Sequence, residues 1–290
     1  YHPNASCGGT SLTVENWATA TLYTYTPYQP NAASLAAGSG TGDGCSTYGN
    51  RNFYLYYTNW FGSTQSNVVT SVNSIPHVLG VDSTGALVAY PGDGKGSWRN
   101  PVQIGYGWNS FKFIVGVGDL SGDGSRDVVA VDQAGTATLY RTDGQLGWLG
   151  SEPIATGWEN KTAVFSPGDF DSDGIPDIFT RDPDGTLWLH PGSPRGGLLA
   201  PRAVGSGWQS MTALVGMRDF NGDGRADVIA RDAAGLLWLY PGNGSGGWLT
   251  PRQIGWGWGS LNSLLTPGDF NGDGFDDVMA RDAQGRLLLF

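Results

Sequence analysis

The sequence predicts an all-β protein, a five-bladed β-propeller of 50-residue, four-stranded repeats with a small N-terminal appendage pinned by a disulfide. The chain aligns with itself at a spacing of 50 residues without gaps, which is typical of repeat architectures. It contains 47 glycines, 12 tryptophans and 12 tyrosines but only 14% charged residues, which favours short strands and tight turns over long helices. Each repeat also holds four short strand-like segments, as a propeller blade requires.

The repeat is defined by residue types that recur in a fixed phase. Aspartate and glycine hold two of these phases in every unit, and aromatic or branched apolar residues hold the others. The matching sets are Trp108, Trp158, Trp208 and Trp258; Asp82, Asp132, Asp182, Asp232 and Asp282; Gly85, Gly135, Gly185, Gly235 and Gly285; Tyr90, Tyr140, His190, Tyr240 and Phe290; and Ile104, Ile154, Val204 and Ile254.

The unit that begins at Trp208 illustrates the predicted strands. Residues 211–217 read as the first strand, and a loop over 219–227 leads to a second strand over 228–231. A tight turn over 232–235 precedes the third strand, 236–240. A glycine-rich segment over 241–247 then leads to a fourth strand over 248–254.

Five such units begin near residues 58, 108, 158, 208 and 258, so we assign residues 48–290 to the propeller. The last unit stops at Phe290, before its fourth strand. Residues 48–57 lie in phase with 248–257 and include the strand-like run 53–57. We expect this strand to complete the last blade and close the ring, which would remove an exposed sheet edge. Simple truncation of the last blade is the alternative.

Residues 1–47 lie outside the repeat and are interpreted as a β-rich appendage whose role the sequence does not reveal. The two cysteines of the chain, Cys7 and Cys45, are expected to form a disulfide, with two unpaired buried thiols as the alternative. This pairing suits a secreted, extracellular protein. No apolar run is long enough to predict a transmembrane helix. No signal segment precedes Tyr1, so we expect a processed chain or a fragment of a longer precursor.

Four loops, which start at Asp119, Asp169, Asp219 and Asp269, share one pattern of oxygen donors. Oxygens at positions 1, 3 and 5, glycine at 6 and a backbone carbonyl at 7 match the front half of an EF-hand calcium loop. An aspartate at position 9 closes each loop. The predicted metal ligands are Asp119, Ser121, Asp123, Ser125 and Asp127; Asp169, Asp171, Asp173, Ile175 and Asp177; Asp219, Asn221, Asp223, Arg225 and Asp227; and Asp269, Asn271, Asp273, Phe275 and Asp277.

Carboxylates packed this closely repel one another unless a cation neutralises them, and hard oxygen ligands favour Ca²⁺ over zinc or copper. A single loop of this type could be an ordinary turn, but four copies in phase predict four structural Ca²⁺ sites. The first unit has Val69, Ser71, Asn73 and His77 at the corresponding side-chain positions, so no calcium is expected there.

The Asp-Phe-Asn-Gly-Asp-Gly segments at Asp219 and Asp269 closely resemble FG-GAP/VCBS repeats of integrin-type propellers and secreted bacterial proteins. The resemblance covers roughly residues 58–290 and implies calcium at the loop positions named above. Separately, residues 104–113 look like the repeat of tachylectin-type five-bladed lectins, which bind amino sugars between blades. The calcium loop departs from that repeat. Residues 25–32 and 48–54 look like segments of secreted actinobacterial cell-wall proteins.

The sequence favours a binding protein over an enzyme. It contains three histidines, none in a nucleophile motif, and its close carboxylate pairs lie in the predicted metal loops. A net charge of −10 argues against nucleic acid as a partner. The expected partner is a carbohydrate or cell-surface glycan, and the alternative is a secreted protein such as a hydrolase or protease that the propeller would target or regulate. The candidate sugar-stacking residues, which could instead be core between blades, are Trp98, Trp108, Trp148, Trp158, Trp208, Trp248 and Trp258.

Overall fold

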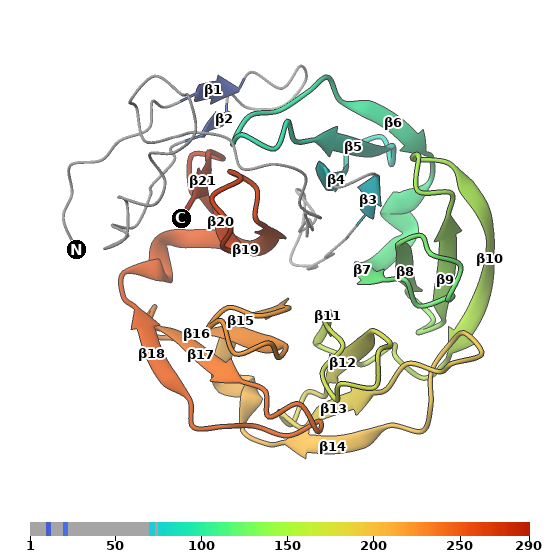
Figure 1. Cartoon of the computed structure of the whole chain (residues 1–290), viewed down its shortest axis with the longest axis vertical. Coiled ribbons are helices and arrows are strands. Elements are labelled where there is room, and N and C mark those ends of the chain that lie inside the picture. The colour runs from blue at the N-terminus through green and yellow to red at the C-terminus, as the bar shows by residue number, and fades with distance from the viewer. Residues whose placement is uncertain (1–9, 13–19, 23–69, 73–74) are drawn as a thin grey trace.

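The computed structural model describes residues 10–12, 20–22, 70–72 and 75–290. Within them, five antiparallel sheets stand radially around a ring (Figure 1). The prediction of an all-β, five-bladed propeller is therefore confirmed. A separate pair of short strands, β1 (Thr10–Leu12) and β2 (Ala20–Leu22), precedes the ring in sequence.

Each blade is a meander in which sequence neighbours pair as strand neighbours, and the last blade has three strands within the described residues. Blade 1 comprises β3 (Thr70–Val72), β4 (Ile75–Val81), β5 (Leu87–Pro91) and β6 (Val102–Gly105). Blade 2 comprises β7 (Phe111–Gly118), β8 (Asp127–Asp132), β9 (Ala137–Thr142) and β10 (Trp148–Ala155). Blade 3 comprises β11 (Ala163–Gly168), β12 (Asp177–Arg181), β13 (Leu187–His190) and β14 (Arg202–Gly205). Blade 4 comprises β15 (Met211–Met217), β16 (Asp227–Asp232), β17 (Leu237–Pro241) and β18 (Arg252–Gly255), and blade 5 comprises β19 (Leu261–Gly268), β20 (Asp277–Asp282) and β21 (Leu287–Leu289).

The fourth strand of blade 4 begins later than the sequence predicted. Strand β18 covers 252–255 rather than 248–254, and only an isolated bridge joins Trp248 to Gly242. Pro251 has no backbone N–H to donate to a ladder, so regular pairing begins after it. Blade 2 has Ser151 at that position, and there β10 pairs from Trp148 onward.

Among the described residues, the hydrophobic core is divided into five clusters, each of which spans one boundary between adjacent blades. The boundary between blades 5 and 1 closes the ring. There Trp98 packs on Phe270 with ring centroids 4.8 Å apart, and the backbone N–H of Gly96 donates to the carbonyl of Phe270. Burial of apolar surface between blades is therefore what holds the sheets side by side.

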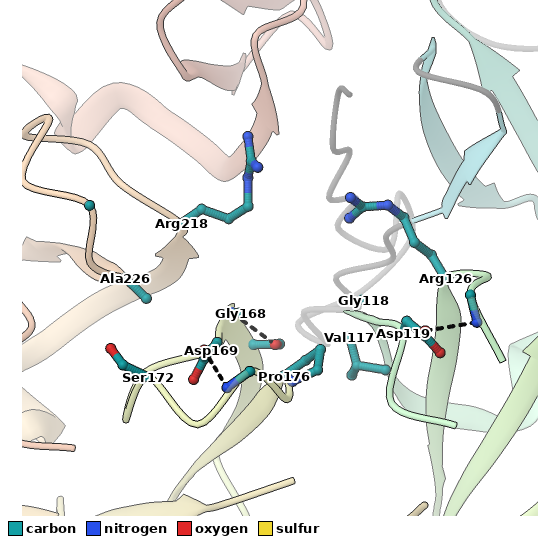
Figure 2. Close-up of a pocket in the computed structure, with 14 residues that line it drawn as sticks. Val117, Gly118, Asp119, Arg126, Gly168, Asp169, Ser172, Pro176, Arg218 and Ala226 are labelled. Atoms are coloured by element: carbon teal, nitrogen blue, oxygen red, sulfur yellow. Dashed lines mark hydrogen bonds between the residues drawn. The ribbon is translucent and has the colours of Figure 1, made fainter. Parts of the chain in front are cut away.

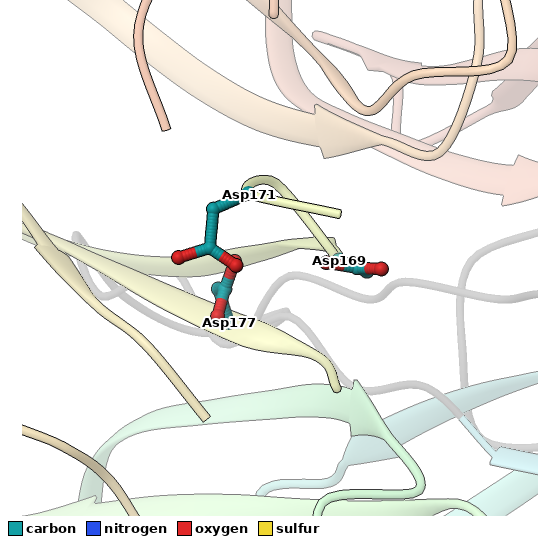
Figure 3. Close-up of side chains that lie close together, drawn as sticks. All are labelled: Asp169, Asp171 and Asp177. Carbon is teal, nitrogen blue, oxygen red and sulfur yellow. The ribbon is translucent and has the colours of Figure 1, made fainter. Parts of the chain in front are cut away.

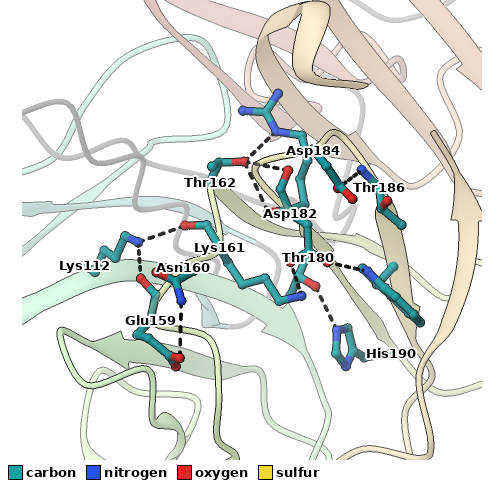
Figure 4. Close-up of polar contacts among 12 residues, drawn as sticks. Lys112, Glu159, Asn160, Lys161, Thr162, Thr180, Asp182, Asp184, Thr186 and His190 are labelled. Carbon is teal, nitrogen blue, oxygen red and sulfur yellow. Dashed lines mark hydrogen bonds and ion pairs between the residues drawn. The ribbon is translucent and has the colours of Figure 1, made fainter. Parts of the chain in front are cut away.

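Polar contacts reinforce the boundary between blades 2 and 3 (Figure 4). Lys112 of β7 donates to the carbonyls of Glu159 and Lys161 at 2.8 and 2.9 Å. Lys161 in turn forms a 2.6 Å ion pair with Asp182, whose other oxygen accepts from the indole N–H of Trp188. These contacts tie the connection into blade 3 to both sheets.

The meander order places two kinds of loop on opposite faces of the ring. Loops that join the first and second strands of a blade, which include the four aspartate loops, lie on one face, called here the loop face. Connections from one blade to the next, such as residues 105–111, lie on the other, called here the connection face. The predicted metal ligands and the turns that follow each fourth strand are thereby separated.

Several sequence predictions fall outside the described residues. These are the Cys7–Cys45 disulfide, most of the 1–47 appendage, and the closing strand within 48–57. They remain predictions. In the part of the chain that the structure describes, no helix is long and apolar enough to cross a bilayer.

Candidate functional site

The front half of each aspartate loop is organised around the aspartate at position 1. In the first loop the carboxylate of Asp119 accepts backbone N–H groups from Gly122, Asp123 and Gly124 at 2.8 to 3.0 Å. The loop starting at Asp219 repeats these three contacts at 2.7 to 3.0 Å. A carboxylate that accepts several N–H groups bends the chain into a tight arc, so the sequence itself folds the loop around this residue.

The aspartate at position 9 is buried in each loop. Asp127, Asp177 and Asp227 are 0% exposed, and Asp277 is 5% exposed. Burial raises the pKa of Asp127 to about 6, that of Asp177 to about 7 and that of Asp227 to about 6, because the charged form loses its hydration. The pKa of Asp277 is also raised well above its usual value by burial. An adjacent cation would offset this cost.

Three buried oxygens of the loops lack a hydrogen-bond partner, which tests whether the residues fit a metal. They are Oγ of Ser121, Oδ1 of Asp127 and Oδ1 of Asp171, at positions 3 and 9 of their loops. In the second loop, Asp169, Asp171 and Asp177 each offer an oxygen within 4.8 Å of the others (Figure 3). Buried polar atoms normally have partners, so these oxygens fit the ligand set of a hard divalent cation.

The remaining predicted ligands take the positions that the spacing requires. At position 5, the aspartate accepts the backbone N–H of position 7 at 2.9 to 3.0 Å in all four loops. The residues at position 7 are Ser125, Ile175, Arg225 and Phe275, and the side chains of Ile175 and Phe275 offer no oxygen, so only the backbone carbonyl could serve as a common ligand. In blade 1, His77 is buried at the place that Asp127 occupies in blade 2.

The tryptophans singled out in the sequence form contacts between blades. Trp108, Trp158 and Trp208 are 6%, 3% and 6% exposed, while Trp258 is partly buried. Trp148 is also partly buried and donates its indole N–H to the carbonyl of Ile104 in the preceding blade at 2.7 Å. Trp248 makes the equivalent bond to Val204 at 2.8 Å, and Trp98 packs on Phe270. Other protein atoms therefore cover most of the surface of the indole rings of Trp108, Trp158 and Trp208.

Two other aromatic residues, which the sequence analysis did not single out, project into solvent. Tyr106 is 84% exposed and Trp256 is 76% exposed. Both occupy the middle of a Gly-X-Gly-Trp turn on the connection face. The first glycine lies against the indole of the following tryptophan, where a Cβ would collide, and the second adopts φ of 74° after Tyr106 and 82° after Trp256. This turn directs the middle residue outward.

A signal for these two residues exists in the sequence. The same turn position holds Tyr106, Thr156, Ser206 and Trp256, whereas the neighbouring tryptophan is invariant across the four units. Positions that pack between blades repeat, and this exposed one varies. Variation within the repeat, rather than repetition, marks residues that the fold does not constrain.

Comparison with known proteins agrees with the loop geometry. A family model described as FG-GAP-like repeat matches residues 119–180, 169–230 and 219–280, each match spanning two successive loops. The chain belongs to the FG-GAP-like repeat family. A search of curated proteins found no match.

Solved structures similar to this FG-GAP-like propeller include three further proteins. The BP39L lectin from Burkholderia pseudomallei has 21% identity and a TM-score of 0.49, over 76% of this chain and 63% of that one. The chain therefore spans less than two thirds of that protein. An Agrocybe aegerita lectin, described as recognising non-reducing terminal N-acetylglucosamine, has 14% identity and a TM-score of 0.44, over 84% and 77%. AofleA from Arthrobotrys oligospora has 14% identity and a TM-score of 0.43, over 77% and 71%.

Proposed function

We propose that this FG-GAP-like propeller is a secreted, non-catalytic, calcium-stabilised protein that binds carbohydrate through its connection face. The observation that carries the proposal is the pair of solvent-exposed rings at Tyr106 and Trp256, held outward by the same glycine turn. Tryptophan and tyrosine are enriched among the residues that contribute most to binding energy at interfaces. The C–H faces of a sugar ring stack on the electron-rich face of an aromatic ring.

The two rings would act as separate, repeated sites. Tyr106 lies on the connection between blades 1 and 2, and Trp256 on the connection between blades 4 and 5. Two equivalent sites on a rigid ring engage a multivalent glycan more tightly than one, because the second contact is intramolecular. A glycan-coated surface is therefore a better target than a free monosaccharide.

Calcium would stabilise the fold and would have no catalytic role. The support for it is the set of buried, unpartnered oxygens in the loops and the buried carboxylates at position 9. When bound, the ion would supply positive charge that neutralises these carboxylates and fixes the arc of each loop. The residues that would hold it are those predicted from the loop spacing.

The test is binding of the chain to a glycan array, followed by titration of each hit with Tyr106→Thr and Trp256→Ser variants. These substitutions introduce residues that the same turn already carries at Thr156 and Ser206. We expect each to weaken binding about tenfold, equivalent to about 1.4 kcal/mol, and the double variant to abolish it. An array with no hits at high protein concentration would remove the proposal.

A matched control separates stacking from loss of any exposed apolar side chain. Leu149 is 58% exposed on the outer strand of blade 2, and blade 1 carries Arg99 at that position. The Leu149→Arg variant should keep full glycan affinity. If it loses glycan binding as strongly as Trp256→Ser does, the rings have no special role.

A further inference from the structure

A cavity of about 450 Å³ opens on the loop face, among the aspartate loops of blades 2, 3 and 4 (Figure 2). Its lining includes Asp119 and Asp169 from two of these loops, Pro176 and Ala226, and the side chains of Arg126 and Arg218. Figure 2 shows the two arginines reaching toward the cavity from different sides. A volume of several hundred Å³ is typical of a small-molecule site.

The two arginines break the repeat at the positions that line this cavity. Arg126 takes the place that Pro176 and Ala226 hold in blades 3 and 4. Arg218 takes the place of a glycine that blades 2, 3 and 5 retain, namely Gly118, Gly168 and Gly268. Otherwise the lining consists of the loop residues Asp119 and Asp169 together with glycine, serine and small apolar residues.

The arginine at position 218 is accompanied by a change in the backbone of its blade. Gly118, Gly168 and Gly268 have φ of 76°, 90° and 77°, a region that side-chain-bearing residues rarely adopt, and the strand pairing is interrupted just before each of them. In blade 4 the pairing runs without interruption from Ala213 to Met217, which lies opposite Asp227, and Arg218 is not among the positive-φ residues. The backbone at Arg218 therefore follows a different path, one that accommodates a residue with a side chain.

Arg218 contacts the next blade but is not fully covered by it. It forms an ion pair with Asp276 of blade 5 at 3.5 Å, and 42% of its side-chain surface remains exposed beside the cavity. The boundary between blades 2 and 3 makes the corresponding contact without charge, because Pro176 packs over Gly118. Blades can thus be joined at this position by a proline and a glycine.

We propose that this cavity binds the carboxylate or sulfate group of a small acidic ligand, such as an acidic sugar, between Arg126 and Arg218. Guanidinium groups bind planar oxyanions through paired N–H donors. The chain carries a net charge of −10, so anions should not accumulate elsewhere on its surface. This inference concerns the opposite face from Tyr106 and Trp256 and does not rest on the proposed glycan sites.

The test is isothermal titration of the chain with glucuronate and with glucose, which differ by the carboxylate. Calcium is included in the buffer, because Asp119 and Asp169 also line the cavity and a bound cation would offset their charge. We expect glucuronate to bind at least about tenfold more tightly than glucose, a difference of about 1.4 kcal/mol. Competition with inorganic sulfate distinguishes two modes of recognition. If sulfate displaces glucuronate, the oxyanion alone is recognised. If sulfate does not displace it, the oxyanion is recognised together with its sugar ring.

Three variants test which arginines cause the preference for glucuronate over glucose. Arg218→Gly and Arg126→Ala install residues that other blades carry at these positions, and thermal melting confirms that each variant is folded. The preference for glucuronate should disappear in both. Arg195→Ser, which removes an exposed arginine outside the cavity lining, is the control with the same change in net charge and should retain the preference. Equal affinity for the two sugars in the unmodified chain, or a preference that persists in Arg218→Gly and Arg126→Ala, would overturn the proposal.

Discussion

Blades 3 and 4 are neighbours with aligned sequences, yet they solve the same packing problem with different residues. In blade 4 the ring of Tyr240 packs on Trp208 with centroids 4.5 Å apart, and in blade 3 His190 packs on Trp158 at 4.8 Å. The histidine also has a polar partner in its own blade, since its Nε2 lies 2.9 Å from Oγ1 of Thr180. Blades 2, 4 and 5 have alanine at the position of Thr180.

The loops of the two blades differ in charge as well. Blade 3 has Asp171 at position 3, where blade 4 has Asn221. The amide of Asn221 donates to Asp223 at 3.1 Å, whereas an oxygen of Asp171 lies close to both Asp169 and Asp177. The histidine of blade 3 teaches that a substitution in this repeat is accommodated when a second residue supplies a partner for the new side chain.

The largest effect is expected from removing the ion that would balance the loops. Excess EDTA should lower the melting temperature strongly, because a ligand at 100 times its Kd contributes about 2.7 kcal/mol to the free energy of unfolding for each site. Calorimetry with and without chelator measures the change. An identical melt in both conditions would contradict calcium stabilisation.

Two variants, one in blade 3 and its control in blade 2, sharpen this measurement. Asp171→Asn introduces the residue of blade 4 and should reduce the calcium-dependent part of the melting shift, because one carboxylate is lost from the cluster. Asp143→Asn is the matched control in blade 2. Asp143 accepts two backbone N–H groups, as Asn243 does in blade 4, so this change should leave the shift intact.

The next effect is the dependence of stability on pH that His190 of blade 3 should confer. Burial lowers the pKa of His190 from 6.5 to about 4, so in acid the unfolded chain binds a proton that the folded chain excludes. The contribution of His190 to stability is therefore lost as pH falls from about 6.5 toward 4, by up to about 3 kcal/mol. Urea denaturation at a series of pH values measures this slope.

The double variant His190→Tyr with Thr180→Ala installs the pair that blade 4 carries. It should remove the part of the slope between pH 6.5 and 4 that His190 contributes, because the buried imidazole of blade 3 is gone. The Thr180→Ala variant alone retains the histidine and serves as the control. A slope unchanged in the double variant would assign the acid sensitivity to other groups.

The smallest effect concerns position 4 of the same loops. It is Gly222 in blade 4 with φ of 80°, but Ser172 in blade 3 with φ of 63°. A residue with a side chain is strained there, so Ser172→Gly should stabilise the chain by about 0.5–1 kcal/mol. Ser151→Gly, in strand β10, should destabilise it by a similar amount, and an equal sign for both changes in chemical denaturation would contradict the strain.

Much of the fold could be predicted because the sequence repeats with a regular period. The four loop starts and the turn glycines recur every 50 residues, so strand order and loop position follow directly. The fourth-strand boundary was wrong in blade 4 because Pro251 interrupts pairing, a local effect that periodicity does not report.

The functional surface was harder to predict for a physical reason. Repetition identifies residues that pack, and Trp108 and Trp208 repeat because they are buried between blades. Residues that meet solvent or a ligand escape this constraint, so Tyr106, Trp256 and Arg218 appear only as departures from the pattern. The exposure of these residues depends on the geometry of their turns and on how neighbouring blades pack. Both are defined only in the assembled ring.

The contact between Trp98 and Phe270 has a consequence for how the chain assembles. Four of the five hydrophobic clusters join segments that follow one another in the chain, so each can form as soon as its two sheets exist. The fifth joins residues at the two ends of the described ring and must wait for a long-range encounter, which is slow because of its loop-closure entropy. If the blades fold one after another, the contact between Trp98 and Phe270 should form last. Mechanical or thermal unfolding should begin with its loss.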